Sequence, residues 1–367
     1  MNYQGLTVCQ TFFNFLAGGR IMNKCKGILI FFIIVLLFSS CNFPADLTSS
    51  QNSPPQVLGE AIFHFIDVGQ GDCVLIQAEN KNILIDAGTG DSASYLFRYL
   101  ENLDVDYIDY FINTHPHEDH LGGAESILTS IDVGTVFVNG TASNSKFFEE
   151  FLDVLIKKEI TPVIPDLDCI YELGPFRIKF LSPTKTHIDE NDNSLVCTVE
   201  FGEIKALFMG DAEKNIESEL LQNKKLIDAD ILKVGHHGSR YASSLPFLTA
   251  VSPSVSVIQC GEGNSYSHPH EEAIQRLDTV FSEVYRTDKD GDIILKTDGK
   301  VITKSDGELF EKKDSSDIKL IYIGNKNSKV FHLETCANLP SDKNRFDFTS
   351  REDALGSGYK PCGNCNP

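Results

Sequence analysis

Four potential metal ligands lie within a stretch of six residues, 115–120 (HPHEDH). His115 and His117 are two residues apart, so their side chains project to the same side of an extended chain and can bind one ion. Asp119 and His120 are adjacent, so a turn can direct both toward a second ion nearby. Imidazole and carboxylate groups together suit zinc, manganese or iron. The spacing predicts a metal centre; the alternative is a polar turn that is merely rich in histidine.

The segments on either side of this stretch predict a strand and a helix. Residues 106–113 (DYIDYFIN) alternate apolar and polar side chains and are rich in Ile, Tyr and Phe, which is typical of a strand. Residues 121–131 carry apolar side chains at helical spacing, which predicts one helix that starts at the cluster. The ligands would then lie on a strand-to-helix turn, open to solvent and held by rigid elements.

Several ordered motifs carry a resemblance to a known family. Residues 114–120 (THPHEDH) resemble the HxHxDH motif of the metallo-β-lactamase superfamily. Asp86, after NILI, matches the early aspartate of that superfamily, and Asp211, after ALFMG, matches its metal-bridging carboxylate. Residues 231–239 (ILKVGHHGS), followed by SYSHPH, are similar to the hydrolase domain of ComEC competence proteins and to related cell-surface phosphocholine esterases. The resemblance covers residues 60–305 and implies an α/β fold, the αβ/βα sandwich of the superfamily.

The resemblance implies a hydrolase centre that holds two divalent metal ions, zinc or manganese, and cleaves a phosphate ester. One of the two adjacent late histidines would bind metal, and the other would face the phosphate. The implied ligands of the first ion are His115, His117 and Asp211, and those of the second are Asp119, His120, the bridging Asp211 and one of His236 and His237.

The same resemblance implies how the remaining site residues act. His268, in SHPH, would donate a hydrogen bond to the substrate or a proton to the leaving group. The implied catalytic residues are Asp119, Asp211 and His268, and the implied substrate contacts are Asn191, Ser194, His237 and His268.

One position departs from the pattern of the superfamily. Many members place a further histidine between the first cluster and the bridging aspartate, and residues 190–196 (ENDNSLV) contain none. His187 lies close by but precedes the turn, so we expect it to lie outside the site. The first ion would then keep open positions for water and for a substrate oxygen.

Residues 61–78 predict two apolar strands around the turn GQGD. Glycine at two turn positions permits positive φ. We expect Asp67 and Asp72 to serve this turn, with support of the metal ligands from behind as the alternative, and His64 to be structural. Four cysteines in apolar stretches are expected to pack in the interior, namely Cys73, Cys169, Cys197 and Cys260.

The N-terminal region predicts export and attachment to a membrane. Two lysines precede a twelve-residue apolar run, 27–38, and the small residues Ser-Ser-Cys follow it. A bilayer span needs about 20 apolar residues, so the pattern is typical of a secretory signal. The sequence LFSSC resembles a lipoprotein cleavage site, which implies a signal peptide over 1–41, a lipidated Cys41 and an extracytoplasmic membrane lipoprotein; an uncleaved anchor is the alternative. Residues 42–59, rich in Ser, Pro, Gln and Asn, predict a flexible tether.

A second module is predicted after a polar linker at 306–317. Residues 318–367 are too few to bury a large core, so a metal ion would stabilise their fold. They resemble the zinc-binding domain of the Ada DNA-repair protein, which uses four cysteines; here a histidine would replace one. Disulfides are the alternative in an exported protein. The predicted ligands of this structural zinc are His332, Cys336, Cys362 and Cys365.

The net charge of the chain favours some classes of substrate over others. The chain carries −20, and −23 without residues 1–40, which hold three basic residues and no acidic one. This charge disfavours general binding of a phosphate backbone, whereas residues 318–367, with seven basic and five acidic residues, favour a local contact. The favoured function is a surface-anchored phosphodiesterase or nuclease related to DNA uptake, with the uptake machinery as partner. The alternatives are hydrolysis of cell-wall phosphodiesters and a non-catalytic surface protein that binds DNA through the tail.

Overall fold

The computed structural model describes residues 59–223, 227–305, 307–310, 320–334, 336, 338–363, 365 and 367. The predicted signal peptide with Cys41, the tether up to residue 58 and most of the predicted linker lie outside the described residues. In the described part of the chain, no helix has the length and apolar character that a membrane crossing requires.

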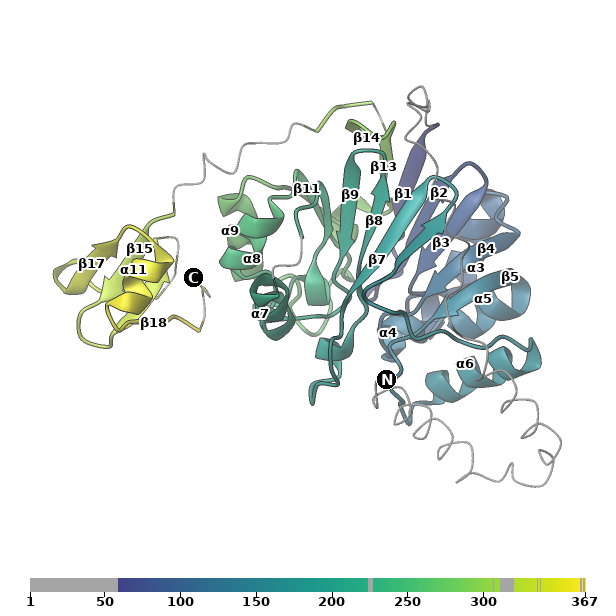
Figure 1. Cartoon of the computed structure of the whole chain (residues 1–367), viewed down its shortest axis with the longest axis horizontal. Coiled ribbons are helices and arrows are strands. Elements are labelled where there is room, and N and C mark those ends of the chain that lie inside the picture. Colours follow the sequence, from purple (N-terminus) through teal and green to yellow (C-terminus); the bar gives the residue numbers. More distant parts are fainter. Residues whose placement is uncertain are drawn as a thin grey trace, which may run out of the picture. The chain divides into compact units, whose positions relative to one another are not determined.

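Two seven-stranded sheets form the main domain (Figure 1). Strands β3, β4 and β5 run parallel to one another, as do β9, β10, β11 and β12. The first sheet has the order β14 (Ile302–Lys304), β13 (Ile293–Thr297), β1 (Ala61–Phe65), β2 (Val74–Ala78), β3 (Lys81–Ile85), β4 (Tyr107–Ile112), β5 (Asp132–Phe137). The second has the order β12 (Glu283–Arg286), β11 (Val255–Ile258), β10 (Ile231–Lys233), β9 (Ile204–Phe208), β8 (Val196–Phe201), β7 (Phe176–Ser182), β6 (Ile170–Leu173).

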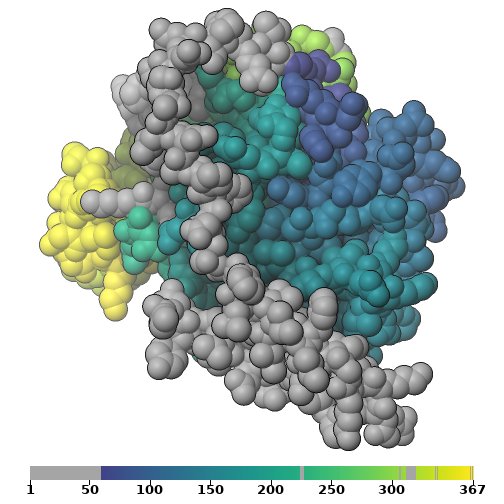
Figure 2. Space-filling model, turned by 45° about the vertical axis from the view of Figure 1, so that its right-hand side comes forward, coloured from purple at the N-terminus to yellow at the C-terminus, as the bar shows by residue number. Residues whose placement is uncertain are grey.

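Apolar side chains fill the space between the sheets, and helices cover the outer faces. Phe63 and Phe65 of β1 belong to the same buried cluster as Phe180 of β7 and Phe208 of β9. Fully burying one such ring contributes roughly 1.5–3 kcal/mol, so this layer holds the sheets together. The space-filling view shows the blue and teal halves packed directly against each other (Figure 2).

A second and a third buried cluster lie beneath the helices. The clusters combine side chains of each sheet with those of the helices over it, and Figure 1 shows the two groups of helices on opposite sides. The predicted αβ/βα sandwich is therefore confirmed. The first sheet is covered by α3 (Ala93–Asn102), α5 (Ala124–Ser130) and α6 (Lys146–Lys157), and the second by α7 (Lys214–Gln222), α8 (Leu245–Val251) and α9 (Glu271–Thr279).

Of the two elements predicted on either side of the metal ligands, the strand is confirmed and the helix differs from the prediction. The strand predicted at 106–113 is β4. The helix predicted at 121–131 is confirmed over 124–130 as α5, but it does not start at the cluster, because a separate short helix, α4 (Glu118–Leu121), precedes it and the two meet at Gly122 and Gly123. A Cβ atom at Gly122 would lie 2.4 Å from the backbone N of Gly90, and one at Gly123 would lie 2.3 Å from the Ala87 carbonyl oxygen. The chain bends here so that two backbones can approach closely.

The C-terminal module has its own small sheet. Its strands follow the order β17 (Arg345–Phe348), β15 (Tyr322–Asn325), β16 (Val330–Leu333) and β18 (Lys360–Pro361). Helix α11 (Arg351–Gly356) begins at Ser350, whose hydroxyl accepts a hydrogen bond from the Asp353 N–H. A few apolar side chains, among them Phe331 and Ala354, are buried within the module, which is a small core for an independent fold.

Candidate metal centre

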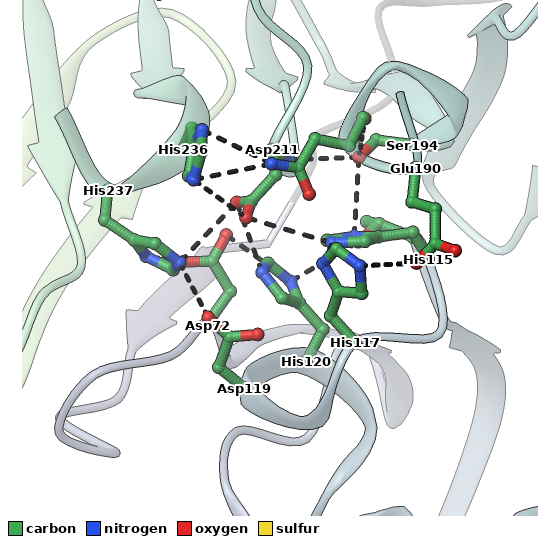
Figure 3. Close-up of polar contacts among 12 residues, drawn as sticks. Asp72, His115, His117, Asp119, His120, Glu190, Ser194, Asp211, His236 and His237 are labelled. Carbon is green, nitrogen blue, oxygen red and sulfur yellow. Dashed lines mark hydrogen bonds and ion pairs between the residues drawn. The ribbon is translucent and has the colours of Figure 1, made fainter. Parts of the chain in front are cut away.

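The predicted site residues come from loops that follow strands and meet at one end of the two sheets (Figure 3). Asp86 follows β3, and residues 113–117 follow its parallel neighbour β4. Asp211 follows β9, and the short helix η3 (Gly235–Gly238) follows the parallel neighbour β10. Because parallel strands end at the same edge of a sheet, the fold brings these loops together.

We call the predicted site of the second ion position 2. It comprises the side chains of Asp119, His120, Asp211 and His237. One ligand atom from each of the four lies within 4.8 Å of all the others. His120 Nε2 lies 3.2 Å from Asp211 Oδ1, and His237 Nε2 lies 3.3 Å from Asp119 Oδ2. His120 Nε2, His237 Nε2 and Asp211 Oδ1 are buried and have no hydrogen-bond partner. Buried polar atoms are normally paired, so this donor set fits a divalent cation.

His237 rather than His236 faces position 2. The Nδ1 of His237 lies 2.9 Å from the Gln259 carbonyl oxygen, which leaves Nε2 pointing at the carboxylates. His236 instead places Nδ1 2.8 Å from Glu213 Oε1 and Nε2 3.8 Å from Asp211 Oδ2. Both residues have left-handed backbones, with φ of 46° and 52°, and the two adjacent rings point in different directions (Figure 3). The geometry therefore separates two residues that the sequence left equivalent.

Position 1, the predicted site of the first ion, comprises His115, His117 and Asp211, which as a set are not among the converging ligand groups found in the described part of the chain. His115 Nε2 lies 3.0 Å from His117 Nδ1 and 3.8 Å from Asp211 Oδ2. The Nε2 of His117 lies 2.8 Å from Glu190 Oε2, so a carboxylate orients this ring from behind. The two oxygens of Asp211 thus face two different sets of imidazoles, which is the arrangement expected of a bridging carboxylate.

Asp86 supports His120 from the side away from position 2. It is fully buried, and its oxygens accept hydrogen bonds of 2.7 Å from both the N–H and the hydroxyl of Thr114. His120 Nδ1 lies 2.7 Å from Asp86 Oδ2. A carboxylate behind a ligating imidazole fixes the ring and raises its basicity, so Asp86 positions His120 rather than serving as a ligand.

Carboxylates and imidazoles shift one another's pKa values at this site. Burial lowers the pKa of His237, but the carboxylates of Asp211 and Asp72 outweigh it and raise this pKa to about 10. Burial likewise opposes the charged form of His120, yet Asp211 and Asp86 raise its pKa well above the usual value. Both imidazoles are therefore protonated near neutral pH when no metal is bound. Metal binding must displace these protons, so the affinity for metal falls as the pH falls.

Asp72 lies inside the site, so the structure favours the alternative role behind the metal ligands over the role in the turn. Its carboxylate is buried, with Oδ2 2.5 Å from Lys233 Nζ and Oδ1 3.3 Å from His237 Nδ1. Lys233 is itself only 2% exposed and also donates to the Val234 carbonyl oxygen. The sequence feature that could have revealed this ion pair is Lys233, the only charged residue of the apolar strand β10. A buried ammonium requires a partner of opposite charge.

Backbone hydrogen bonds fasten the metal-binding loop to two other loops. The Asp72 N–H donates to the Asp119 carbonyl oxygen over 3.0 Å, and the Ala87 N–H donates to the His120 carbonyl oxygen over 2.7 Å. A Cβ atom at residue 71 would lie 2.4 Å from the Asp119 carbonyl oxygen, so only Gly71 allows this approach. The short helix α4, which carries Asp119 and His120, is thus tied to both loops by backbone hydrogen bonds that involve none of the metal-ligand atoms.

We expect Asp72→Asn to weaken binding of the ion at position 2 by about 10- to 100-fold, because residues behind metal ligands hold the ligand rings in place. Lys233→Met should have a similar effect, since it leaves Asp72 as a buried carboxylate without a partner. Metal affinity is measured by competition with a metal-sensitive dye. Lys296→Met is the control, because its ammonium lies 3.3 Å from Glu60 at the surface. Wild-type affinity in both site variants would show that Asp72 serves the turn alone.

Of the predicted substrate contacts, Asn191 and His268 lie beside His236, whereas Ser194 lies behind the metal ligands. Asn191 Nδ2 lies 3.5 Å from the His236 ring nitrogens, and the His268 ring centroid lies 5.3 Å from that of His236. Ser194 is fully buried, donates to the Asn191 carbonyl oxygen and accepts from the Asp211 N–H. The hydroxyl of Ser194 is thus committed behind the ligands, and we correct its role from a substrate contact to a support of Asp211.

His187 lies apart from these groups, as expected. Its Nε2 is 3.8 Å from Glu219 Oε2, and its backbone N–H donates to Asn193 Oδ1. Of the cysteines expected to pack in the interior, Cys73, Cys197 and Cys260 are buried and Cys169 is half-buried. Neither the histidine nor these cysteines is among the residues whose ligand atoms converge in the described part of the chain.

The C-terminal module brings its four predicted ligands to one point. One ligand atom of each lies within 4.8 Å of the others, and all four residues are buried. His332 Nδ1 lies 3.4 Å from Cys336 Sγ, and the Leu333 N–H lies 3.5 Å from Cys365 Sγ. One imidazole and three thiols around one point fit a tetrahedral zinc ion.

Comparison with known proteins agrees with this architecture. The family model of the metallo-beta-lactamase superfamily matches residues 66–262. ComE operon protein 3 of Bacillus subtilis (strain 168) is 30% identical over 261 residues, which cover 65% of this chain and 33% of that protein. Competence protein ComA of Neisseria gonorrhoeae is 29% identical over 235 residues, which cover 63% of this chain and 32% of that protein. The match therefore spans about a third of the length of these relatives.

The solved structures that are similar to this chain include a metallo-beta-lactamase fold protein. The crystal structure of the metallo-beta-lactamase fold protein YhfI from Bacillus subtilis is 14% identical, covers 65% of this chain and 100% of that chain, and has a TM-score of 0.46. The family model covers more than half of the sequence, and the chain belongs to the metallo-beta-lactamase superfamily.

Proposed function

We propose that this metal-dependent hydrolase is a phosphodiesterase that cleaves DNA outside the membrane to which it is anchored. The observation that carries the proposal is Asp211, whose Oδ1 lies 3.2 Å from His120 Nε2 and whose Oδ2 lies 3.8 Å from His115 Nε2. One carboxylate between two sets of imidazoles suits a pair of divalent ions. Such a pair, when bound, would supply Lewis-acid stabilisation and a water nucleophile at neutral pH.

The residues around this centre would bind and orient a phosphodiester. His236, held by Glu213, would face a phosphate oxygen, and Asn191 lies beside it. Burial and the neighbouring His236 and His237 lower the pKa of His268 to about 3. This ring is neutral near pH 7, so we assign His268 a hydrogen bond to the substrate rather than the donation of a proton. Its buried Nδ1 has no hydrogen-bond partner within the protein, which leaves that atom available for a ligand.

DNA is the favoured substrate because the matched relatives include proteins named for competence. A cell-wall phosphodiester is the second candidate, since the net charge of −20 disfavours contact with a long phosphate backbone. Binding of DNA through the C-terminal module without catalysis is the third. The DNA-uptake machinery is the proposed partner in the first case.

The test combines metal analysis with three substrates. The purified protein is assayed on single-stranded DNA, on bis(p-nitrophenyl) phosphate and on a phosphocholine ester, and its metal content is measured. The proposal expects two ions in the hydrolase site, one in the tail, and cleavage of DNA and of the generic diester. Cleavage of the phosphocholine ester alone would favour the cell-wall function. DNA binding without cleavage of any substrate would favour the non-catalytic function.

Membrane anchoring is tested separately. We expect Cys41→Ser to release the protein from membranes or to leave the precursor uncut, because the thiol of this residue would carry the lipid. The measurement is fractionation of cells grown with labelled fatty acid, with Cys169→Ser as the control. If the wild-type protein never carries the label, the lipoprotein assignment fails.

A further inference from the structure

A row of aromatic rings leads away from the metal centre. The His236 and His268 ring centroids are 5.3 Å apart, and those of His268 and Tyr266 are 5.8 Å apart. The last two rings are stacked, with an interplanar angle of 25°. Tyr266 is 63% exposed, so one face of its ring covers His268 while the other is open to solvent. His236 Nε2 lies 3.8 Å from Asp211 Oδ2, so the row begins at the bridging carboxylate.

The loop that carries Tyr266 is ordered by one side chain. The Nδ2 of Asn264 donates to the carbonyl oxygens of Gly261 and His268, over 2.9 and 2.5 Å. Its Oδ1 accepts from the N–H groups of Tyr266 and His268, over 3.2 and 3.0 Å. The Gly261 N–H donates in turn to Gln70 Oε1 in the turn beside the metal centre. Tyr266 is therefore held in place by its backbone, although its ring is largely uncovered.

We propose that Tyr266 forms a stacking subsite for a nucleobase of single-stranded DNA next to the scissile phosphate. The inference rests on the proposed nuclease function and names the part of the substrate that this region contacts. An aromatic ring that is exposed yet held in place binds a flat partner without first being ordered, which lowers the cost of binding. Every base has a π-face, so such a contact favours nucleic acid without selecting a sequence.

The geometry favours a flat base over a choline headgroup. Quaternary ammonium groups are bound in cages of several aromatic rings. Here the Tyr266 ring is stacked on the His268 imidazole with an interplanar angle of 25°, and a planar base would extend that stack. Stacking requires no positive charge, so this local contact allows a strongly acidic chain to bind DNA.

The experiment compares a single-stranded oligothymidylate with an abasic strand of equal length, using the purified full-length chain with its metals. Tyr266→Ala should lower kcat/KM for oligothymidylate by roughly 5- to 150-fold, the scale of base–aromatic stacking. It should leave cleavage of the abasic strand unchanged. Tyr266→Phe keeps the ring and should match the wild type. Tyr241→Ala removes another tyrosine, 50% exposed, and should have no effect.

Failure of the inference is distinguishable from failure of the proposed function. If the protein cleaves both strands and Tyr266→Ala slows both equally or neither, stacking is refuted while the nuclease function stands. If neither strand is cleaved, the nuclease function fails, and binding of the same strands by fluorescence anisotropy still decides whether Tyr266 contacts bases. A loss in Tyr266→Ala that is confined to the phosphocholine ester would assign the ring to a cation and overturn the inference.

Discussion

Replacing Asp211 with alanine is expected to release bound metal and to slow phosphodiester cleavage at least about a hundredfold, the scale expected when a group central to transition-state charge stabilisation is removed. Oδ1 and Oδ2 of this residue face positions 2 and 1 respectively. The variant would leave position 1 with only His115 and His117, whereas catalytic zinc sites normally keep three protein ligands. Metal content and turnover of bis(p-nitrophenyl) phosphate are the measurements.

His187→Ala is the matched control for this variant. Its ring lies near Glu219, 3.8 Å from Oε2, and not among the residues of positions 1 and 2. The control should therefore keep wild-type metal content and turnover. An inactive His187→Ala protein beside an active Asp211→Ala protein would mean that the ligand assignment is wrong and that His187 supplies the further histidine of the superfamily pattern.

The second large effect is expected in the C-terminal module. Cys362→Ser combined with Cys365→Ser should remove one zinc ion and unfold residues 318–367, because in a module with so small a core the free energy of metal binding is largely the free energy of folding. The hydrolase domain should keep its own metal and its turnover. Zinc content and the thermal unfolding transitions of the two parts are measured side by side.

Cys169→Ser serves as the control for the double variant, because Cys169 is half-buried and lies in the hydrolase domain. It should leave the zinc of the module in place. Recovery of the cysteines of the module as disulfides in the native protein would contradict the prediction, since thiols joined in this way cannot ligate zinc as thiolates.

The sequence predicted the parts of the site that are encoded within short segments. HPHEDH carries four ligands at fixed spacing, and the alternation in 106–113 predicts the strand that delivers them. Asp211 was identified from the resemblance to the superfamily, whose metal-bridging carboxylate it matches. Ligand types and strand periodicity are local properties, so a single sequence is enough to identify them.

Other parts of the site depend on contacts between distant segments. Asp72 and Lys233 are far apart in the sequence and meet only because their two sheets face each other. His236 and His237 are adjacent and chemically identical, so only their left-handed backbone conformations, which turn the rings apart, separate their roles. The break at Gly122 and Gly123 likewise arises from a neighbouring loop that the helical pattern of 121–131 does not contain.

The backbone hydrogen bonds of the metal-binding segment have a consequence for how the protein acquires its ions. The N–H groups of Asp72 and Ala87 donate to the carbonyl oxygens of Asp119 and His120, and these bonds involve none of the metal-ligand atoms. Loading of the hydrolase site therefore requires no refolding, and its speed is set by the supply of ions and the loss of their hydration water. The C-terminal module is the opposite case, because its ligands and its fold depend on each other. In a metal-poor environment the same chain would thus keep a catalytic domain ready for reloading while the module at its end loses its structure.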